Sequence, residues 1–290
     1  MPTAADGDTE GEAVRRCAVL GSPIGHSLSP VLHRAAYSDL RLDWRYDAFE
    51  VDEQGLAGFL DQLGPEWRGL SLTMPLKRVA LSLCDEVSDQ ARLVGAVNTV
   101  LLDDGRRTGA NTDVPGIVAA LSERGVTSAR RALLLGVGAT ACSALAGLAE
   151  IGIVDVLAVA RDPARAGELQ ALAAALGVRT SVVSWEVARE SRAVDVAVST
   201  VPDRAAGPLA HVVAERAQVV FDVLYHPWPT RLAVTASDAG RVVVGGLDLL
   251  VHQAGVQVEL MTRRSPAPVA AMRTAGEKAL EARGLAADTT

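Results

Sequence analysis

The sequence predicts a two-lobed α/β protein with largely parallel sheets. Short runs of valine and leucine alternate with alanine-rich helical stretches over nearly all of the 290 residues. Alternation of strands and helices is typical of parallel sheets covered by helices. A glycine turn at 136–141 lies between one such strand and one such helix, which is typical of the first unit of a dinucleotide-binding lobe.

Ten segments have the length and the content of branched apolar residues expected of strands. They span residues 17–21, 45–51, 69–73, 98–103, 131–136, 154–160, 179–184, 194–200, 217–223 and 241–245. Apolar residues with helical spacing occur between them, most clearly at 29–40, 139–152 and 163–177. The chain therefore divides near residue 115 into two lobes, each with its own series of strands.

Four segments follow from this alternation. We expect a first α/β lobe at 15–115, a second lobe at 116–247, and C-terminal helices at 248–285 that pack back on the first lobe. No strand follows these last helices, so they can close the gap between the lobes, where small ligands usually bind. Residues 1–14 are small, polar and acidic, which is typical of a disordered tail rather than of a targeting peptide.

The composition argues against several classes of function. The net charge is −7 and aromatic residues make up only 3% of the chain. Such a chain neither attracts nucleic acid nor offers rings for base stacking, and no apolar run is as long as a membrane span. Cys17, Cys84 and Cys142 are far apart in the sequence and form no cluster of metal ligands. We therefore expect reduced thiols in a cytoplasmic protein, no bound metal, and no nucleic-acid or membrane partner.

Gly136, Gly138 and Ala141 form a G-x-G-x-x-A turn between an apolar strand and an alanine-rich helix. The first glycine permits the tight turn, and the second lets the pyrophosphate of a dinucleotide approach the backbone. The helix N-terminus, which includes Ala139 and Thr140, then offers N–H groups to the phosphates. The alternative is a turn whose glycines serve packing alone, but the strand–turn–helix context favours the dinucleotide site.

The end of the next strand selects between NAD and NADP. An NAD site has an acidic residue there for the ribose 2′-hydroxyl, whereas this chain has Arg161. A guanidinium at this point suits the 2′-phosphate of NADP, and Arg165 lies one turn later. Asp162 precedes a proline, so we interpret it as the N-cap of the following helix. We expect NADP as the cofactor.

Polar residues gather near the strand ends of the first lobe. Ser27 and Ser29 precede a helix, where two hydroxyl groups and the helix N-terminus suit a carboxylate. Because Ser29 is followed by proline, it is equally compatible with a simple helix cap. Asn98, Thr112 and Asp113 follow at later strand ends. A sugar-like polyol needs a ring of such groups, although each motif alone is also compatible with an ordinary loop.

Lys77 and Lys278 are the only lysines among 28 basic residues. Nearly all basic residues of this sequence are arginines, so a lysine can indicate a position that needs what arginine cannot do, namely lose a proton. Lys278 lies in a charged helical stretch and is interpreted as a surface residue. Lys77 follows Met74 and Pro75, where we expect a strand to end and a helix to begin with Lys77 in its first turn.

Seven motifs resemble, in order, those of the shikimate dehydrogenase family: GSPIGHSLSP, GLSLTMPLK, GAVNT, GANTD, GVGATA, DVLYHPWPT and GGLDLLVHQA. The resemblance extends from residue 17 to about residue 262. It implies an N-terminal α/β substrate-binding domain and a C-terminal Rossmann-type NADP-binding domain. It also implies NADPH-dependent reduction of 3-dehydroshikimate to shikimate, a small molecule, in the biosynthesis of aromatic amino acids. We expect a monomer or a homodimer.

The resemblance also implies roles for single residues. Lys77 and Asp113 would form the catalytic pair, with Lys77 donating the proton when the carbonyl is reduced. The residues implied for the substrate are Ser27 and Ser29 at its carboxylate, Thr73, Asn98 and Gln253 at its ring hydroxyls, and Tyr225 near the nicotinamide. The residues implied to flank the nicotinamide are Gly246 and Leu249.

The sequence departs from the family at Ser71, where asparagine is common, and at Ala139, where a third glycine is usual. Two alternative functions stay open. A quinate/shikimate or aminoshikimate-type dehydrogenase would use the same scaffold, although Arg161 argues against an NAD-preferring form. A non-catalytic sensor of shikimate-like ligands would need no proton donor, so the presence of Lys77 and Asp113 argues against it.

Overall fold

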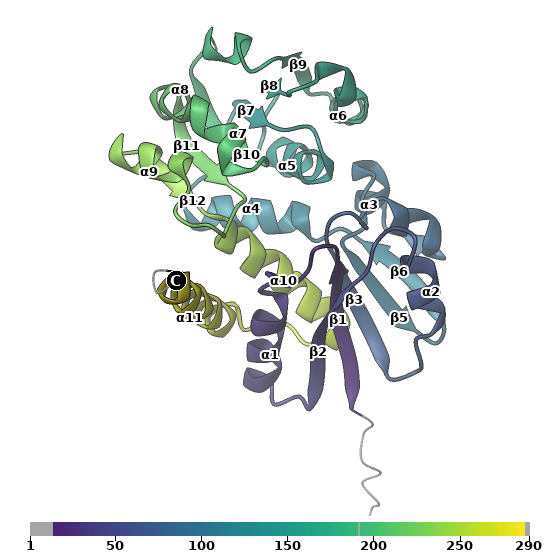
Figure 1. The fold of residues 1–290 in the computed structure, drawn as a ribbon. Coiled ribbons are helices and arrows are strands. Elements are labelled where there is room, and N and C mark those ends of the chain that lie inside the picture. Colours follow the sequence, from purple (N-terminus) through teal and green to yellow (C-terminus); the bar gives the residue numbers. More distant parts are fainter. Residues whose placement is uncertain (1–13, 191, 288–290) are drawn as a thin grey trace, which may run out of the picture.

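The computed structural model describes residues 14–190 and 192–287, so nearly all of the predicted tail at 1–14 lies outside the described residues. Two α/β halves lie one above the other in Figure 1, and each is built on a six-stranded sheet. This arrangement confirms the two-lobed α/β fold that the sequence predicts.

The first half contains strands β1 to β6. Their bounds are Arg15–Gly21, Trp44–Glu50, Trp67–Leu72, Glu86–Val87, Thr99–Asp103 and Arg106–Ala110. The strand order is β2-β1-β3-β5-β6-β4, and β5 runs antiparallel to both β3 and β6. Thr99, the first residue of β5, pairs with Ser71 and with Ala110. The antiparallel direction therefore brings the start of β5 to the sheet edge where β3 and β6 end.

Short helices surround this first sheet. Their bounds are Ser29–Asp39 for α1, Leu56–Asp61 for α2 and Asp89–Val94 for α3, with a 3-10 helix, η1, at Val79–Leu83. Leu20, Leu70 and Val100 belong to neighbouring strands and are fully buried in one apolar cluster. This packed core holds the strand ends, and the loops that follow them, in fixed positions.

The second half contains strands β7 to β12. Their bounds are Arg131–Leu135, Asp155–Val159, Arg179–Val183, Val194–Ser199, Ala217–Asp222 and Val242–Val244. All are parallel, in the order β9-β8-β7-β10-β11-β12. This is the doubly wound order of dinucleotide-binding folds. From β7 the chain adds β8 and β9 on one side of the sheet, and it then returns to add β10, β11 and β12 on the other side. Ligands of such sheets bind outside the carboxyl ends of the strands at that reversal.

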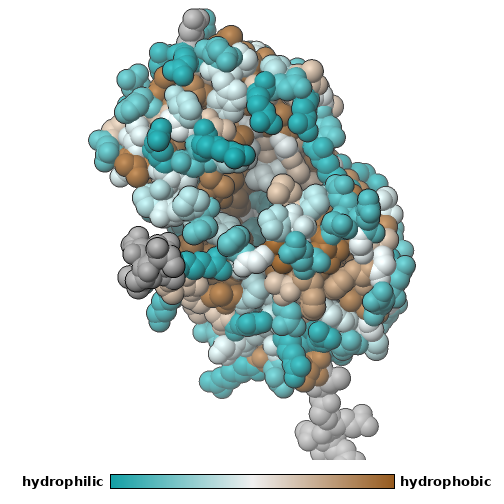
Figure 2. All heavy atoms as spheres, viewed as in Figure 1, coloured by the Kyte–Doolittle hydropathy of each residue, from teal (hydrophilic) through white to brown (hydrophobic). Residues whose placement is uncertain are grey.

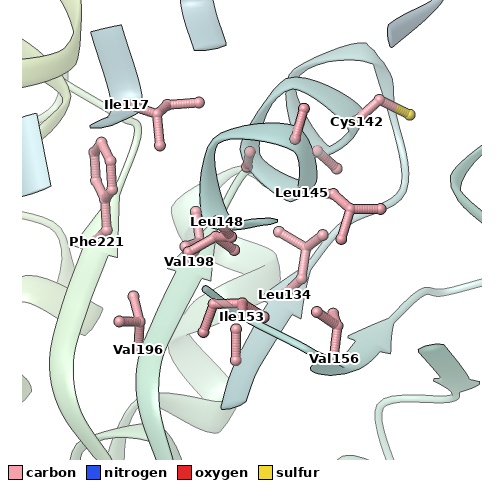
Figure 3. Close-up of a cluster of buried hydrophobic side chains, with 14 of the residues drawn as sticks. Ile117, Leu134, Cys142, Leu145, Leu148, Ile153, Val156, Val196, Val198 and Phe221 are labelled. Carbon is pink, nitrogen blue, oxygen red and sulfur yellow. The ribbon is translucent and has the colours of Figure 1, made fainter. Parts of the chain in front are cut away.

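Helices cover both faces of the second sheet. The α-helices are α5 at Ala139–Glu150, α6 at Gly167–Ala175, α7 at Asp203–Ala206, α8 at Ala210–Arg216 and α9 at Arg231–Asp238. The 3-10 helices are η2 at Pro163–Ala166, η3 at Val187–Glu190 and η4 at Gly207–Leu209. Figure 3 shows the core under α5, where Leu145 and Leu148 face Leu134 and Val198 of the strands.

The remaining helices are α4 at Asp113–Glu123, α10 at Gly246–Thr262 and α11 at Val269–Ala287. Ile117 of α4 belongs to the core of the second half, near Phe221 in Figure 3. In contrast, Val251 of α10 and Met272 of α11 pack with Leu32 of α1. Figure 1 shows α11 beside α1, so this helix packs on the first half.

All ten predicted strands are present, and their ends lie within two residues of the predicted ones. Two strands, β4 and β6, were not predicted. β4 has only two residues, and β6 has the polar sequence RRTGA. Asp104 and Gly105 join β5 to β6 with positive φ angles of 48° and 79°. An Asp-Gly pair with this conformation is a strong hairpin signal. The turn before β6 therefore predicts a second strand, although the polar residues of β6 do not.

Candidate active site

The two halves enclose a cleft, which is visible as a hollow between them in Figure 2. One part of the cleft is a cavity of about 250 Å³ beside the ends of β1 and β3. Its lining includes every residue predicted for catalysis or substrate binding: Ser27, Ser29, Thr73, Lys77, Asn98, Asp113, Tyr225 and Gln253. Residues that are far apart in the sequence therefore meet in one small space.

Lys77 and Asp113 form an ion pair in this cavity. The Nζ atom of Lys77 lies 2.6 Å from Oδ2 of Asp113, and both side chains are largely buried. Asp113 is the first residue of α4. The amide oxygen of Asn111 accepts hydrogen bonds from the backbone N–H groups of Asp113 and Val114. Asn111 thus fixes the start of α4 and the position of Asp113. It belongs to the GANTD motif, but the motif alone did not reveal this role.

Lys77 lies in a turn, and the prediction that it opens a helix is wrong. Residues 74–78 form this turn, and the short 3-10 helix η1 begins only at Val79. Proline at 75 ends the strand as expected, but the backbone that follows is held by a distant segment. The carbonyl oxygen of Lys77 accepts a hydrogen bond from the N–H of Val97 at 2.7 Å. This long-range bond, rather than a helix, positions the lysine.

Asn98 links the ion pair to the neighbouring polar groups. Its Oδ1 accepts hydrogen bonds from the backbone N–H of Thr112 at 2.8 Å and from the hydroxyl of Thr99 at 2.9 Å. Its Nδ2 donates to Oδ1 of Asp113 at 2.9 Å. Because a backbone N–H can only donate, the orientation of the amide is fixed. Asn98 therefore occupies one carboxylate oxygen of Asp113 and leaves the other to Lys77.

Ser27 and Ser29 lie at the start of α1. The helix begins at Ser29, and the residue in the N-cap position is Leu28, which makes no side-chain capping bond. The hydroxyl of Ser27 accepts a hydrogen bond from the N–H of Ser29 at 3.3 Å. The alternative in which Ser29 is only the helix cap is therefore wrong. Both serines border the cavity beside the first N–H groups of the helix.

The second half and α10 supply the opposite wall of the cavity. Tyr225 follows β11, and Gly246, Leu249 and Gln253 belong to α10. A Cβ atom at Gly246 would lie 2.3 Å from the carbonyl oxygen of Val223, so only glycine lets α10 begin this close to the loop after β11. Burial raises the pKa of Tyr225, so its hydroxyl stays protonated at neutral pH.

A second cavity, of about 740 Å³, runs along the carboxyl ends of β7, β8 and β10. Gly136, Gly138, Arg161 and Arg165 of the predicted cofactor site all line this groove. Gly136 has a φ of 111°, and a Cβ atom there would lie 2.3 Å from Oγ1 of Thr200, so this turn requires glycine. Gly138 faces open space immediately before α5, which leaves its backbone accessible to a ligand.

The other predicted cofactor residues lie at the start of α5. Ala139 is the first residue of the helix, and Ala141 is fully buried, so the Ala141 side chain serves packing. Thr140 borders the smaller cavity rather than the groove. Asp162 accepts a hydrogen bond from the N–H of Ala164 at 3.1 Å, which confirms that it caps the helix after β8.

Several residues of the groove were not identified from the sequence. Trp185 and Arg204 line it near Arg161. Arg78 borders it from the first half and forms an ion pair with Glu168 of α6. Both partners of this pair are exposed, and together they bridge the two halves across the groove. Such residues belong to no motif, and only the fold brings them to the same place.

Within the described residues, no group of three or more histidine, cysteine, aspartate or glutamate side chains could hold a metal ion. None of the described helices has the length and apolar character needed to cross a membrane. All three cysteines are unpaired, as predicted, and burial raises the pKa of each thiol to about 11.

Proteins of similar sequence point to one family. The sequence profile described as shikimate dehydrogenase substrate binding domain matches residues 19–100. A shikimate dehydrogenase (NADP(+)) of Thermus thermophilus is 38% identical over 266 residues, which cover 91% of this chain and 98% of that protein.

Solved structures agree with the sequence comparisons. The crystal structure of Mycobacterium tuberculosis shikimate dehydrogenase has a TM-score of 0.85 and 40% identity, covering 91% of this chain and 99% of that one. The shikimate 5-dehydrogenase of another Thermus thermophilus strain, in complex with NADP(H) and shikimate, has a TM-score of 0.81 and 35% identity, covering 92% of this chain and 100% of that one.

Proposed function

The chain belongs to the shikimate dehydrogenase family, and from this membership we propose that it is an NADP-dependent shikimate dehydrogenase. It reversibly reduces the ring carbonyl of 3-dehydroshikimate to the hydroxyl of shikimate, in the route to chorismate and the aromatic amino acids. The observation that carries the proposal is the buried Lys77–Asp113 ion pair, which lies in the cavity between the two halves.

The groove along the second sheet fits NADPH. The glycine turn at Gly136 and Gly138 would hold the pyrophosphate against the N-terminus of α5, because it leaves the backbone open there. Arg161 and Arg165 would hold the 2′-phosphate, and no acidic residue occupies the position after β8 that an NAD site would use. When bound, NADPH supplies the hydride for the reduction.

Lys77 carries the proton transfer. Its ammonium group stabilises the negative charge that develops on the carbonyl oxygen and donates the proton to that oxygen. Asp113 holds the ammonium at 2.6 Å, while Asn98 and Asn111 hold Asp113. In the reverse direction the neutral amine of Lys77 accepts the proton. The backbone of Lys77 is held by Val97 and its ammonium group by Asp113, so this general acid needs little reorganisation during the reaction.

The small cavity suits a single ring that carries a carboxylate and several hydroxyls. Ser27 and Ser29 would bind the carboxylate beside the N-terminus of α1. The remaining assignments are Thr73, Asn98 and Gln253 to ring hydroxyls, Tyr225 to the space between substrate and nicotinamide, and Gly246 and Leu249 to the nicotinamide itself. Residues 15–115 then form the substrate-binding domain, 116–247 the NADP-binding domain, and 248–285 the helices that return to the first domain.

One assay tests the proposal. Purified protein is given NADPH with 3-dehydroshikimate and, separately, NAD⁺ with quinate, and the absorbance of the reduced cofactor is followed. We expect NADPH oxidation to be much the faster reaction. Faster NAD-linked oxidation of quinate would indicate the quinate/shikimate-type activity instead. Shikimate binding measured by calorimetry, without turnover with either cofactor, would identify a sensor and overturn the proposal.

A further inference from the structure

A chain of buried polar side chains lies beneath the substrate cavity. The hydroxyl of Tyr46 is 2.6 Å from Oγ of Ser71, which is 2.7 Å from Oε1 of Gln257. Nε2 of His33 lies 3.3 Å from the same Oε1. None of the four residues is more than 4% exposed, yet Ser71 and Gln257 border the cavity. The chain therefore connects the protein core to the place where a substrate binds.

A backbone carbonyl fixes the orientation of the Gln257 amide. Its Nε2 lies 3.3 Å from the carbonyl oxygen of Asn98 and 3.0 Å from Oγ1 of Thr99. Because a carbonyl oxygen can only accept a hydrogen bond, the NH₂ group must face Asn98. The amide oxygen must then face the opposite way, toward Ser71 and His33.

The orientation of Gln257 sets the direction of every other bond in the chain. An amide oxygen cannot donate, so the hydroxyl of Ser71 gives its only proton to Gln257. Tyr46 must then donate to Ser71. Burial lowers the pKa of His33 to about 3, so the neutral imidazole donates to Gln257 through Nε2. Ser71 is left with one acceptor lone pair and no free donor.

We propose that Gln257 is a specificity-determining positioning residue, which locks the Ser71 hydroxyl so that Ser71 faces the substrate only as a hydrogen-bond acceptor. This inference rests on the proposed function. A ring hydroxyl of the substrate can donate to such an oxygen, whereas a carboxylate, which also only accepts, is repelled by it. The hydrogen-bonded pair of Gln257 and Ser71 therefore selects for a substrate hydroxyl at this point of the cavity.

The position of Gln257 in α10 agrees with this role. It lies four residues after Gln253, so both side chains project from the same face of the helix toward the first sheet. Gln253 accepts hydrogen bonds from Asn98 and Thr112, at 3.4 and 3.3 Å. One helix face thus supplies two consecutive amides to the substrate site.

Substitutions of both partners separate this role from a purely structural one. Gln257→Met, Ser71→Ala and the double variant are compared with the natural protein, and Gln170→Met, an exposed position of α6, is the matched control. We expect each single substitution in the chain to raise KM for 3-dehydroshikimate about 5- to 10-fold, the size of one lost neutral hydrogen bond. Calorimetry without cofactor should show the same loss in shikimate affinity. The kcat and the KM for NADPH should change by less than about twofold.

Because Gln257 acts through Ser71, the double variant should bind no more weakly than the weaker-binding single variant. Deoxy analogues of shikimate then identify the partner group. With the analogue that lacks the hydroxyl bound by Ser71, the natural protein and the Ser71→Ala variant should bind equally well. Ser71→Ala removes only one hydroxyl, so this comparison stands even where Gln257→Met does not fold.

The proposal is wrong if the two substitutions add fully, or if Ser71→Ala keeps its binding loss with every deoxy analogue. A lowered Tm with unchanged KM would equally show a structural role alone. Turnover of 3-dehydroshikimate by the unsubstituted protein is measured first. Its absence would overturn the proposed function, whereas its presence with an unaltered KM in both variants overturns only this inference.

Discussion

The Nζ atom of Lys77 lies 2.6 Å from Oδ2 of Asp113, although the two residues belong to different structural elements. Lys77 occupies the turn after β3, and Asp113 begins α4 after β6. β5 lies between these strands and runs antiparallel to both, so its first residues reach the same edge of the sheet. The mixed sheet therefore brings Lys77 and Asp113 together, and it places the Asn98 side chain beside Asp113.

Replacing Lys77 tests its role as the proton donor. We expect Lys77→Met to lower kcat by about 10²- to 10⁴-fold, the usual contribution of a general acid, while the Kd of shikimate changes little. Steady-state kinetics and calorimetry measure the two quantities separately. Lys278→Met, on the exposed face of α11, is the control and should leave both unchanged. Near-full turnover by Lys77→Met would exclude the assignment.

Arg161 is expected to select NADPH over NADH. Loss of a charge-assisted contact to the 2′-phosphate should raise KM for NADPH about 10- to 100-fold in Arg161→Ala. The KM for NADH should stay nearly constant, because NADH lacks that phosphate. Arg165→Ala, one turn later, provides the comparison and should have a smaller effect. Equal losses for both cofactors would show that Arg161 does not contact the 2′-phosphate.

The Arg78–Glu168 pair is expected to weaken cofactor binding. Glu168 places a carboxylate in the groove proposed for a polyanionic cofactor, and it also engages Arg78. Glu168→Gln should therefore lower KM for NADPH about two- to threefold at low ionic strength, because it removes repulsion and frees the arginine. Both side chains are exposed, so the difference should vanish near 0.5 M salt, where the Debye length is only about 4 Å. A higher KM in this variant would show that the pair instead supports the bound form.

The sequence predicts those parts of the site that depend on local patterns. The strand–turn–helix around Gly136 and the position of Arg161 after β8 were predicted from short segments, because the turn needs glycine and the arginine directly follows an apolar strand. Lys77 was found through its motif, but its helix was not, because a hydrogen bond from Val97 holds that turn. Ser71 and Gln257 are 186 residues apart. Their contact depends on the packing of α10 against β3, which no single segment encodes.

Asp222 is expected to make the folded state less stable as the pH rises from about 4 to 6. Burial raises the pKa of this carboxyl to about 6, against an ordinary value near 3.9. In this window the folded protein keeps a proton that the unfolded chain has lost, so stability falls with increasing pH, by about 3 kcal/mol in all. Relative to the natural protein, Asp222→Asn should therefore gain stability by about that amount between pH 4 and pH 7. Urea unfolding at several pH values measures the difference, and a constant difference would contradict the expectation.

His33 should have the opposite effect over an overlapping range. Its pKa is lowered to about 3 by burial, whereas the unfolded chain titrates near 6.5. Below pH 6.5 the unfolded state binds a proton that the folded state does not, so the stability present at pH 7 is lost as the pH falls toward 3. The full loss is about 5 kcal/mol, of which about 3 kcal/mol has appeared by pH 4.5.

Between pH 4 and 6 the contributions of His33 and Asp222 have opposite signs, so the unsubstituted protein should show a shallow pH dependence that hides both. His33→Gln removes the titrating group and keeps an amide donor for Gln257, so the steep rise due to Asp222 should become visible on acidification. The free energy of unfolding of this variant, minus that of the natural protein, should increase by about 3 kcal/mol from pH 7 to pH 4.5. A difference that does not change with pH would mean that His33 has the same pKa in the folded and the unfolded state, which would contradict the expectation.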